Sequence, residues 1–386
     1  MMLRVFEAFA GYGSQAMALK KYNVPHKIVG VSEIDKYAIQ AHEAVHGPVK
    51  NYGDISKING LCLPEMDLFT YSFPCQDISM AGKQRGLKEG TGSRSSLLWE
   101  CQKIIELKRP KFLMMENVKN LVGKKHKPDF ENWLKVLDQL GYNNYWKVIN
   151  AKFCGIPQNR ERVFCVSILK SHDDGSFSFY DDFDNGVRLK NILESEVDEK
   201  YYLSEDKTRS LIKALEDKGY NGYNGYKRNY ECDGNSYCID ANYHKGTSSG
   251  DVGKSRRTHV VERVILTEAR SEESKRIRRE NMRSGNDYSP RRGKVLKERT
   301  DDICNCLTTS ITKEHLILEK PVYRFRKLTP TECFILMGVS ASDILKIQSA
   351  GISNSQMYKM AGNSIVVDCM KFLEKLVYKN RVVVNE

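Results

Sequence analysis

Cys75 follows a proline in the tetrapeptide Phe73-Pro74-Cys75-Gln76, and its surroundings suit a cysteine nucleophile. The apolar residues 68–72 predict a buried strand, and a segment rich in glycine, serine and lysine continues from Cys75 to Ser95. We therefore expect Cys75 at the tip of a strand, beneath a mobile loop. A small core residue is the alternative, because free cysteine is among the most buried residue types.

A second apolar run, which begins at Phe112, ends on the carboxylate of Glu116 and the amide of Asn117. In an open parallel sheet, side chains beyond the carboxyl ends of the strands face a ligand crevice. Glu116 is therefore expected at the same sheet edge as Cys75. Runs of this kind also occur in core strands that have no chemical role.

Three polar side chains, Gln158, Arg160 and Arg162, precede a further apolar strand at residues 163–168. Successive side chains of a strand point to opposite faces, so alternate residues share one side of the backbone. The three are therefore expected on one side. A row of exposed charges is the alternative.

The N-terminal residues predict a strand at 4–9, a turn that contains Gly11 and Gly13, and a helix from Gln15. A strand, a glycine turn and a helix in this order suit a nucleotide-like cofactor. The third glycine of a dinucleotide fingerprint is missing, so the turn alone does not identify the cofactor.

Two acidic residues extend this interpretation. Glu33 follows a second predicted strand, 27–31, at the distance where an acid accepts hydrogen bonds from ribose hydroxyls. Asp54 comes after the next predicted helix, where a carboxylate can accept from an adenine amine. Each can instead be a solvated loop acid.

The elements that must position these residues indicate an α/β protein. At 386 residues the chain is long enough for one large domain and a smaller second one. Strand and helix patterns alternate up to His172, for instance a helix expected at 96–107 and a strand at 111–115, which predicts a doubly wound sheet. Beyond His172 the composition shifts to tyrosine, asparagine and glycine, which is typical of loops.

The order of these motifs resembles that of the DNA (cytosine-5) methyltransferases, and of their bacterial members in particular. The resemblance covers roughly residues 3–170 and 322–378. It implies a Rossmann-like methyltransferase domain with a smaller target-recognition domain. The blocks that carry it are, in chain order, Phe9-Ala10-Gly11-Tyr12-Gly13, Pro74-Cys75-Gln76, Glu116-Asn117-Val118, Gln158-Asn159-Arg160-Glu161-Arg162, Arg326-Lys327-Leu328-Thr329-Pro330-Thr331-Glu332 and Gly362-Asn363-Ser364.

The resemblance implies that S-adenosylmethionine is the cofactor. In the family, a large apolar residue, often tryptophan, follows the acid at Glu33 and lies against adenine. Here Ile34 offers contact area without an aromatic face. The residues that the resemblance assigns to the cofactor are Phe9, Gly11, Gly13, Glu33, Asp54, Pro74, Asn363 and Ser364.

The chemistry of cytosine explains why a cysteine is needed. Its C5 atom is too weakly nucleophilic to attack a methylsulfonium group unaided. A thiolate that adds at C6 makes the ring electron-rich, and Cys75 is the candidate. Addition places charge on N3 and O2, where the resemblance implies a protonated Glu116 and Arg162 respectively. Arg160 is expected to hold the loop or a phosphate.

A base inside a duplex cannot present C6 to a thiol, so the target cytosine must leave the stack, at a cost on the order of a few kcal/mol. The glycines and basic residues after Cys75 predict a lid that closes over the base and contacts phosphates. A disordered surface loop is the alternative. The residues expected at the DNA or the base are Gln76, Ser79, Lys83, Arg85, Arg94 and Gln158.

The charge of the chain agrees with a nucleic-acid partner. It has 61 basic and 49 acidic residues, a formal net charge of +12. Residues 254–299 concentrate this charge, with fifteen lysines and arginines against seven acidic residues. We interpret them as a footprint for the phosphates of double-stranded DNA. Ion pairs along a solvated helix at residues 272–280 are the alternative.

We place the target-recognition domain at residues 188–325, because sequence specificity requires side chains that reach base edges in the major groove. The catalytic and cofactor-binding domain then comprises residues 1–187 and 326–386. Two segments, 240–246 and 306–310, resemble segments of such recognition domains.

The return to the catalytic domain begins with a helix-start signal. Thr329 as N-cap, Pro330 at N1 and Glu332 at N3 predict a capping box, so this motif is interpreted as structural. A final helix from Ser364 is expected to pack beside the first strand and to bring Asn363 to the cofactor.

The eleven cysteines are scattered, and the pairs Cys232/Cys238 and Cys304/Cys306 lack zinc-ribbon spacing, so no metal site is expected. With no visible secretory signal or transmembrane run, the sequence predicts the reducing cytoplasm of a bacterial or phage-infected cell. We expect a monomer that acts on DNA, without a membrane partner. A restriction endonuclease would be its functional partner if the chain belongs to a restriction-modification system.

Three other functions fit parts of the sequence. A transfer-RNA cytosine-5 methyltransferase uses the same motifs, but it typically carries a Cys-Phe-Thr block in its recognition region, and none occurs here. An NAD dehydrogenase needs the missing glycine and leaves Cys75, Glu116 and Arg162 unexplained. A catalytically inactive DNA-binding protein would not need Cys75, Glu116 and Arg162 together.

Overall fold

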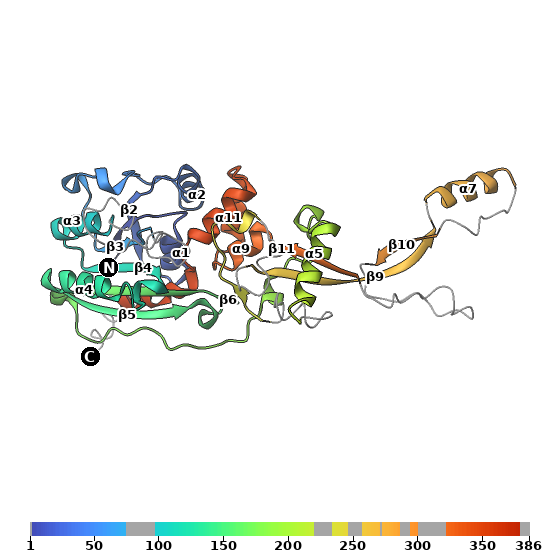
Figure 1. Ribbon diagram of the computed structural model, residues 1–386. Helices are drawn as coiled ribbons and strands as arrows, with labels where there is room; N and C mark the ends of the chain where they lie inside the picture. Colours follow the sequence, from blue (N-terminus) through green and yellow to red (C-terminus); the bar gives the residue numbers. More distant parts are fainter. Residues whose placement is uncertain are drawn as a thin grey trace, which may run out of the picture.

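The computed structural model describes residues 2–74, 97–219, 234–245, 257–270, 272–285, 294–299 and 322–378. These residues form an α/β body from which a long ribbon of two strands projects, with a helix at its far end (Figure 1). None of the helices in these ranges is both long and apolar enough to cross a membrane.

A six-stranded sheet forms the centre of the body, in the order β2-β1-β3-β4-β7-β5. Four strands pair in parallel, β1 with β2 and β3, and β3 with β4, whereas β7 runs antiparallel to β4 and β5. The strands are β1 (Leu3–Ala8), β2 (His26–Ser32), β3 (Leu68–Tyr71), β4 (Phe112–Val118), β5 (Tyr142–Asn150) and β7 (Glu161–Leu169). The predicted α/β fold is confirmed, but the sheet is mixed. Residues 151–160 between β5 and β7 are too few for a parallel crossover, so the chain reverses.

Helices cover both faces of this sheet, as in a doubly wound fold. Neighbouring strand residues point to opposite faces, so Val5 joins one hydrophobic cluster and Phe6 the other. The first cluster includes residues of α1 (Ser14–Lys21) and α2 (Lys36–His46). The second includes residues of α3 (Leu98–Lys108) and α4 (Lys127–Gln139).

Local predictions for this part of the chain agree closely with the structure. The helix expected at 96–107 is α3. Of the five residues that its spacing places on one apolar face, Leu97 is half-buried and the other four are buried, namely Leu98, Cys101, Ile104 and Ile105. The first strand ends at Ala8, one residue earlier than expected, because Phe9 adopts a left-handed φ of 56°. Gly11 and Gly13 continue the turn at φ values of 58° and 84°, which favour glycine.

A smaller antiparallel sheet lies beside the body, in the order β10-β9-β11. Its strands are β9 (His259–Arg270), β10 (Lys294–Arg299) and β11 (Val322–Lys327). Helix α5 (Glu205–Glu216) packs on it through a cluster of Leu211, Leu215, Val261 and Phe325. A short parallel pair, β6 (Gln158–Asn159) and β8 (Ser236–Tyr237), joins the body to the segment that precedes this sheet.

The region 188–325, expected to form the recognition domain, shares its core with the body. Leu189, Ile239 and Tyr243 are buried in the same hydrophobic cluster as residues of α1. The expected boundary after Phe325 falls inside β11, because the next two residues continue to pair with β9. The exact limits of a recognition domain therefore stay a prediction.

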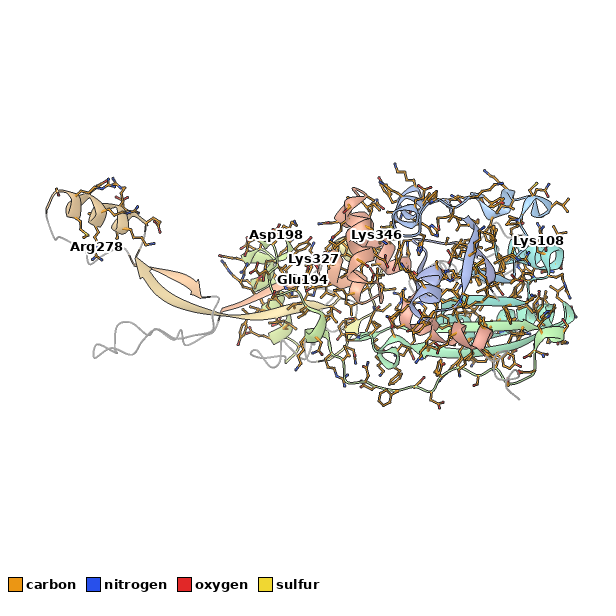
Figure 2. The ribbon with its side chains drawn as sticks, turned by 180° about the vertical axis from the view of Figure 1, so that it is seen from behind. Lys108, Glu194, Asp198, Arg278, Lys327 and Lys346 are labelled. Atoms are coloured by element: carbon orange, nitrogen blue, oxygen red, sulfur yellow. The ribbon has the colours of Figure 1, made fainter. Side chains whose placement is uncertain are left out.

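Helix α7 (Glu272–Arg283) lies at the far end of the ribbon, and several of its charged side chains form ion pairs with one another. Lys275 contacts Glu272, and Arg276 contacts Glu273 and Glu280, at N–O distances of 2.6–2.9 Å. These are the helical ion pairs that the sequence offers as an alternative to DNA contact. The helix still has five basic residues against three acidic ones, and Arg278 lies on it far from the body (Figure 2).

The C-terminal segment returns to the body as α9 (Pro330–Ile335), α10 (Ala341–Ser349), α11 (Asn354–Asn363), a 3-10 helix (Val367–Glu374) and α12 (Lys375–Tyr378). The predicted capping box is confirmed: Glu332 N donates to Thr329 Oγ1 at 3.1 Å, and Thr329 N donates to the Glu332 carboxylate at 2.8 Å. The same carboxylate accepts from Arg326 at 2.9 and 3.0 Å. This buried pair joins the end of β11 to the first turn of α9.

The last helical segment was expected beside the first strand. It packs mainly on α1, and its buried residues share one hydrophobic cluster with Leu3 and Val5 of β1. It begins at Val367, after an extended Ser364. Its Phe372 ring lies against Phe164 of β7 and Phe179, with centroids 5.6 and 4.9 Å apart. This aromatic cluster holds the segment over β7.

Gly362, near the end of α11, lies against the backbone that follows Ile239. A Cβ atom at Gly362 would come within 2.2 Å of main-chain atoms of Asp240 and Ala241. We predict that Gly362→Ala lowers the free energy of unfolding by about 2–3 kcal/mol, in the range of overpacking, as measured by urea denaturation.

Gly60→Ala is the matched control for this prediction. A Cβ atom there meets only the tip of the Leu107 side chain, at 2.8 Å, and that side chain is exposed and free to rotate. Little loss of stability is expected from the control. Equal losses of stability in the two variants would show that the backbone at residues 240–241 does not exclude a side chain at position 362.

Candidate active site

The carboxyl ends of β3 and β4 lie side by side, because the two strands pair in parallel. Pro74 follows β3 at this edge, and Glu116 lies toward the end of β4 at the same edge. The side chain of Asn117 donates a hydrogen bond to the carbonyl oxygen of Phe73 at 3.1 Å, which ties the two strand ends together. The chain therefore approaches Cys75 close to the end of β4, although Cys75 itself lies outside the described residues.

The lid expected after Cys75 also lies outside the residues that the structure describes. This applies to five of the six residues expected at the DNA or the base, namely Gln76, Ser79, Lys83, Arg85 and Arg94. Their roles stay predictions. The sixth, Gln158, belongs to β6.

The side chains of Glu116 and Arg162 are in contact at this edge, with Arg162 Nε 3.3 Å from Glu116 Oε1. The antiparallel register of β4 and β7 explains the contact, because it sets Arg162 opposite Val118, two residues from Glu116. Glu116 is only 7% exposed. Burial raises the pKa of its carboxyl group, and the charges of Arg162 and Arg160 oppose this. The net effect is a carboxyl group that keeps its proton to a higher pH than usual.

The side chains of Gln158, Arg160 and Arg162 all reach the segment that follows β8, as their alternating spacing predicts. Gln158 Oε1 accepts from Ile239 N at 3.2 Å, and Arg160 Nη1 donates to Ile239 O at 2.8 Å. Arg162 Nη2 lies 3.8 Å from the sulfur of Cys238. One side of this extended stretch therefore binds one segment of the recognition region.

Two of these residues are buried inside the protein. Gln158 is 0% exposed and its Nε2 donates to Leu336 O at 2.7 Å, so it braces the end of α9 in place of the expected DNA contact. Arg160 is 2% exposed and donates to the main-chain oxygens of Gly362 and Ser364. It joins chain segments inside the protein, as the expected role of holding a loop requires.

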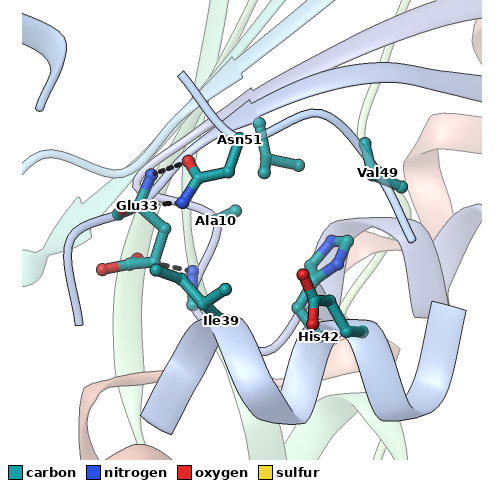
Figure 3. A pocket seen from close by; sticks show the side chains of 9 residues that line it. Ala10, Glu33, Ile39, His42, Val49 and Asn51 are labelled. Atoms are coloured by element: carbon teal, nitrogen blue, oxygen red, sulfur yellow. Dashed lines mark hydrogen bonds between the residues drawn. The ribbon is translucent and has the colours of Figure 1, made fainter. Parts of the chain in front are cut away.

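The carboxylate of Glu33 is fixed beside the glycine turn. It accepts from three backbone N–H groups, those of Gly11 at 2.9 Å and of Ile34 and Asp35 at 2.8 Å. Asn51 holds the main chain of Glu33 with two further hydrogen bonds of 3.0 and 3.1 Å (Figure 3). A carboxylate has about four acceptor positions, so one remains for a ligand.

A small hollow opens beside Glu33, between the glycine turn and α2 (Figure 3). The side chain of Ile34, next to Glu33 in the chain, is 74% exposed. An exposed apolar side chain beside a fixed carboxylate suits a nucleoside, which needs an apolar contact for its base and an acceptor for its ribose. The residues that line the hollow are Ala10, Gly11, Val31, Glu33, Ile39, His42, Glu43, Val49 and Asn51.

The other residues expected at the cofactor divide into two groups. Ser364 Oγ lies 2.6 Å from Ser14 Oγ at the start of α1, so the segment with Asn363 reaches the glycine turn. Asp54 instead caps a short helical turn, since its Oδ1 accepts from the backbone N and the hydroxyl of Ser56. These hydrogen bonds lower the pKa of Asp54 and hold one of its oxygens.

Two residues that shape the site, Ser14 and Cys238, were not singled out as site residues from the sequence. Ser14 directly follows the glycine motif, and its position next to Gly13 was the available signal. Cys238 carried no such signal, because it contacts Arg160 and Arg162 only through the fold.

Comparisons with known proteins identify the family of this chain. The chain matches the family model of the C-5 cytosine-specific DNA methylases over residues 3–379. It is 37% identical to the type II methyltransferase M2.ScrFI of Lactococcus lactis subsp. cremoris, with 98% of this chain and 100% of that protein covered. It is 32% identical to the orphan methyltransferase M.SPRI of Bacillus phage SPR, with 97% of both covered.

The fold agrees with solved structures as well. The Dnmt2 methyltransferase of S. pombe has a TM-score of 0.62 over 99% of both chains, at 18% sequence identity, which shows a shared fold. The family match extends over almost the whole chain, including the ends of β3, β4 and α11 that meet at the site. The chain therefore belongs to the C-5 cytosine-specific DNA methylase family and is a DNA (cytosine-5) methyltransferase.

Proposed function

We propose that this enzyme methylates cytosine at a specific sequence in double-stranded DNA, after the target base has left the stack, with Cys75 as the nucleophile that adds to C6. One observation carries the proposal: the buried Glu116 and the half-buried Arg162 are in contact at the sheet edge that Phe73 and Pro74 reach just before Cys75. Cys75, Glu116 and Arg162 would then act on C6, N3 and O2 of one cytosine ring from a single edge of the sheet.

In this proposal Glu116 donates a hydrogen bond to N3 and Arg162 donates to O2. Both atoms gain charge when the thiolate adds to the ring, and donors fixed in a water-poor site stabilise such charge. Burial raises the pKa of Glu116, although the charges of Arg162 and Arg160 act in the opposite direction. This raised pKa supports a protonated carboxyl group as the donor. Arginine remains charged throughout.

Membership of the family implies S-adenosylmethionine as methyl donor. When bound, it supplies an electrophilic methyl group. The free acceptor position on Glu33 suits a ribose hydroxyl, and the exposed Ile34 suits the adenine face. The residues that we propose to hold the cofactor are Phe9, Gly11, Gly13, Glu33, Asp54, Pro74, Asn363 and Ser364.

DNA is the substrate, and residues 188–325 are proposed to recognise its sequence. Similar proteins include both a type II methyltransferase and an orphan phage methyltransferase, so a partner endonuclease is compatible with this family without being required by it. We propose a monomer in the cytoplasm of a bacterial or phage-infected cell, with any endonuclease as a functional partner.

The nucleophile can be tested with unmethylated plasmid DNA, S-adenosylmethionine and conversion-based sequencing, which reads protected cytosines. The wild-type protein is expected to protect cytosines in one short recurrent sequence. Cys75→Ser is expected to protect none, because a hydroxyl is a poorer nucleophile and leaving group, while its cofactor-binding free energy stays within about 1 kcal/mol of wild type. Loss of cofactor binding would mark Cys75 as structural, and protection by the variant would exclude it as nucleophile.

The role of Glu116 can be tested through the pH dependence of single-turnover methyl transfer. A raised pKa keeps the carboxyl donor protonated to a higher pH, and the rate is expected to fall as pH rises through that pKa. Glu116→Gln is expected to lower the rate by about 100-fold or more and to remove this alkaline limb, because an amide does not ionise. An unchanged limb in the variant would assign the titration to another group.

Sequence recognition can be tested by exchanging residues 262–321 for the matching segment of M2.ScrFI. The exchange leaves Cys238, Ile239 and Tyr243 in place, and with them the contacts to the body. The protected sequence is expected to change while methyl transfer persists. An active chimera with an unchanged target would place recognition elsewhere.

A further inference from the structure

Two histidines of α2, His42 and His46, lie against the glycine turn. Their rings pack on each other, with centroids 4.7 Å apart, and His42 also lines the hollow beside Glu33 (Figure 3). Nε2 of His46 lies 3.3 Å from the main-chain oxygen of Tyr12, which belongs to the turn. A carbonyl oxygen only accepts hydrogen bonds, so the imidazole of His46 is the donor. Neither histidine was expected at the site from the sequence.

The first strand of the sheet fixes the two rings from the other side. The side chain of Glu7, on β1, is fully buried, and its Oε2 lies 3.3 Å from Nε2 of His42. His42 is itself only 3% exposed. Because a buried carboxyl group needs a hydrogen-bond partner, this contact holds the His42 ring between β1 and α2. His42 in turn supports the ring of His46.

Gly13 allows the turn to approach the histidines closely. A Cβ atom at this position would lie 2.4 Å from Nε2 of His46 and 2.9 Å from a ring carbon of His42. Any side chain at position 13 would therefore displace the two rings. The left-handed φ of 84° at Gly13 also favours glycine. Packing and backbone conformation thus make the same demand, and the backbone of the turn rests directly on the histidine pair.

The ring of His46 is neutral at neutral pH. Burial lowers its pKa to about 4, against the opposing charges of Glu7 on β1 and Asp343 on α10. A neutral imidazole carries one N–H, which the contact with Tyr12 O assigns to Nε2. The protein therefore places a donor without a positive charge at the turn, where a cation would repel the positively charged sulfonium group of S-adenosylmethionine.

We propose that His46 is a positioning residue for the cofactor, which holds the carbonyl group of Tyr12 and so keeps the glycine turn in its binding conformation. The neighbouring N–H of Gly11 is held by the carboxylate of Glu33 at 2.9 Å. Adjacent residues of the turn are then fixed by an acceptor and a donor from different segments. A turn that is ordered in advance binds its ligand without a further loss of entropy. This inference rests on the proposed cofactor site at the glycine turn.

The first test measures the dissociation constant of S-adenosylmethionine by titration calorimetry for wild type, His46→Leu and His46→Gln. The leucine variant keeps apolar packing but lacks the donor, and it should bind about fivefold to tenfold more weakly, the range for one net hydrogen bond. The glutamine variant supplies an N–H and should bind within about twofold of wild type. The single-turnover rate at saturating cofactor should be unchanged in both. His172→Leu, at an exposed histidine, is the matched control. Unweakened binding by His46→Leu, or an equal loss in His46→Gln, would overturn the proposal.

A second measurement separates this inference from the cofactor site on which it rests. Amide hydrogen exchange of the free protein, read by mass spectrometry, reports the turn directly, because Gly13 N donates to Ala10 O at 2.9 Å. Exchange in the turn should be faster in His46→Leu than in wild type and His46→Gln, with β4 unchanged in all three. Equal exchange in the turn would refute the role of His46. If His46→Leu exchanges faster but the wild type binds no S-adenosylmethionine, the proposed cofactor site alone is refuted.

Discussion

The buried guanidinium of Arg160 is the constraint on which the rest of the site depends. It cannot lose its charge and presents five N–H donors, so the protein must surround it with acceptors. Those acceptors come from two distant parts of the chain: Cys238 and Ile239 after β8, and Gly362 and Ser364 at the end of α11. A cation that is 2% exposed therefore determines where the recognition region and the C-terminal segment meet the sheet.

The mixed sheet brings the residues around Arg160 next to the proposed catalytic residues. Because β7 runs antiparallel to β4, the residues that enter β7 lie at the edge where β4 ends, and Arg162 meets Glu116 there. Ser364, held by Arg160, lies against Ser14 at the glycine turn. The cofactor turn and the proposed base site are thus coupled through one arginine and one short stretch of backbone, with Gly362 supplying the close approach.

The sequence predicted the parts of this design that are local. Strands and helices in the first half of the chain, the Thr329 capping box and the shared side of Gln158, Arg160 and Arg162 follow from periodicity and helix-start residues. Periodicity does not encode strand direction, so the reversal of β7 was missed. Spacing gives the side on which a polar residue lies but not its burial, which depends on what later packs there. For this reason Gln158 was expected at DNA and is found beneath α9.

Cys238 shows why the chemistry of such a site extends beyond its motifs. Its sulfur comes from another segment of the chain and lies 3.3 Å from Arg160 Nη1 and 3.8 Å from Arg162 Nη2. Residues 236–245 are part of the region expected to recognise DNA. Their packing and strand pairing nevertheless join them to the body beside the candidate site.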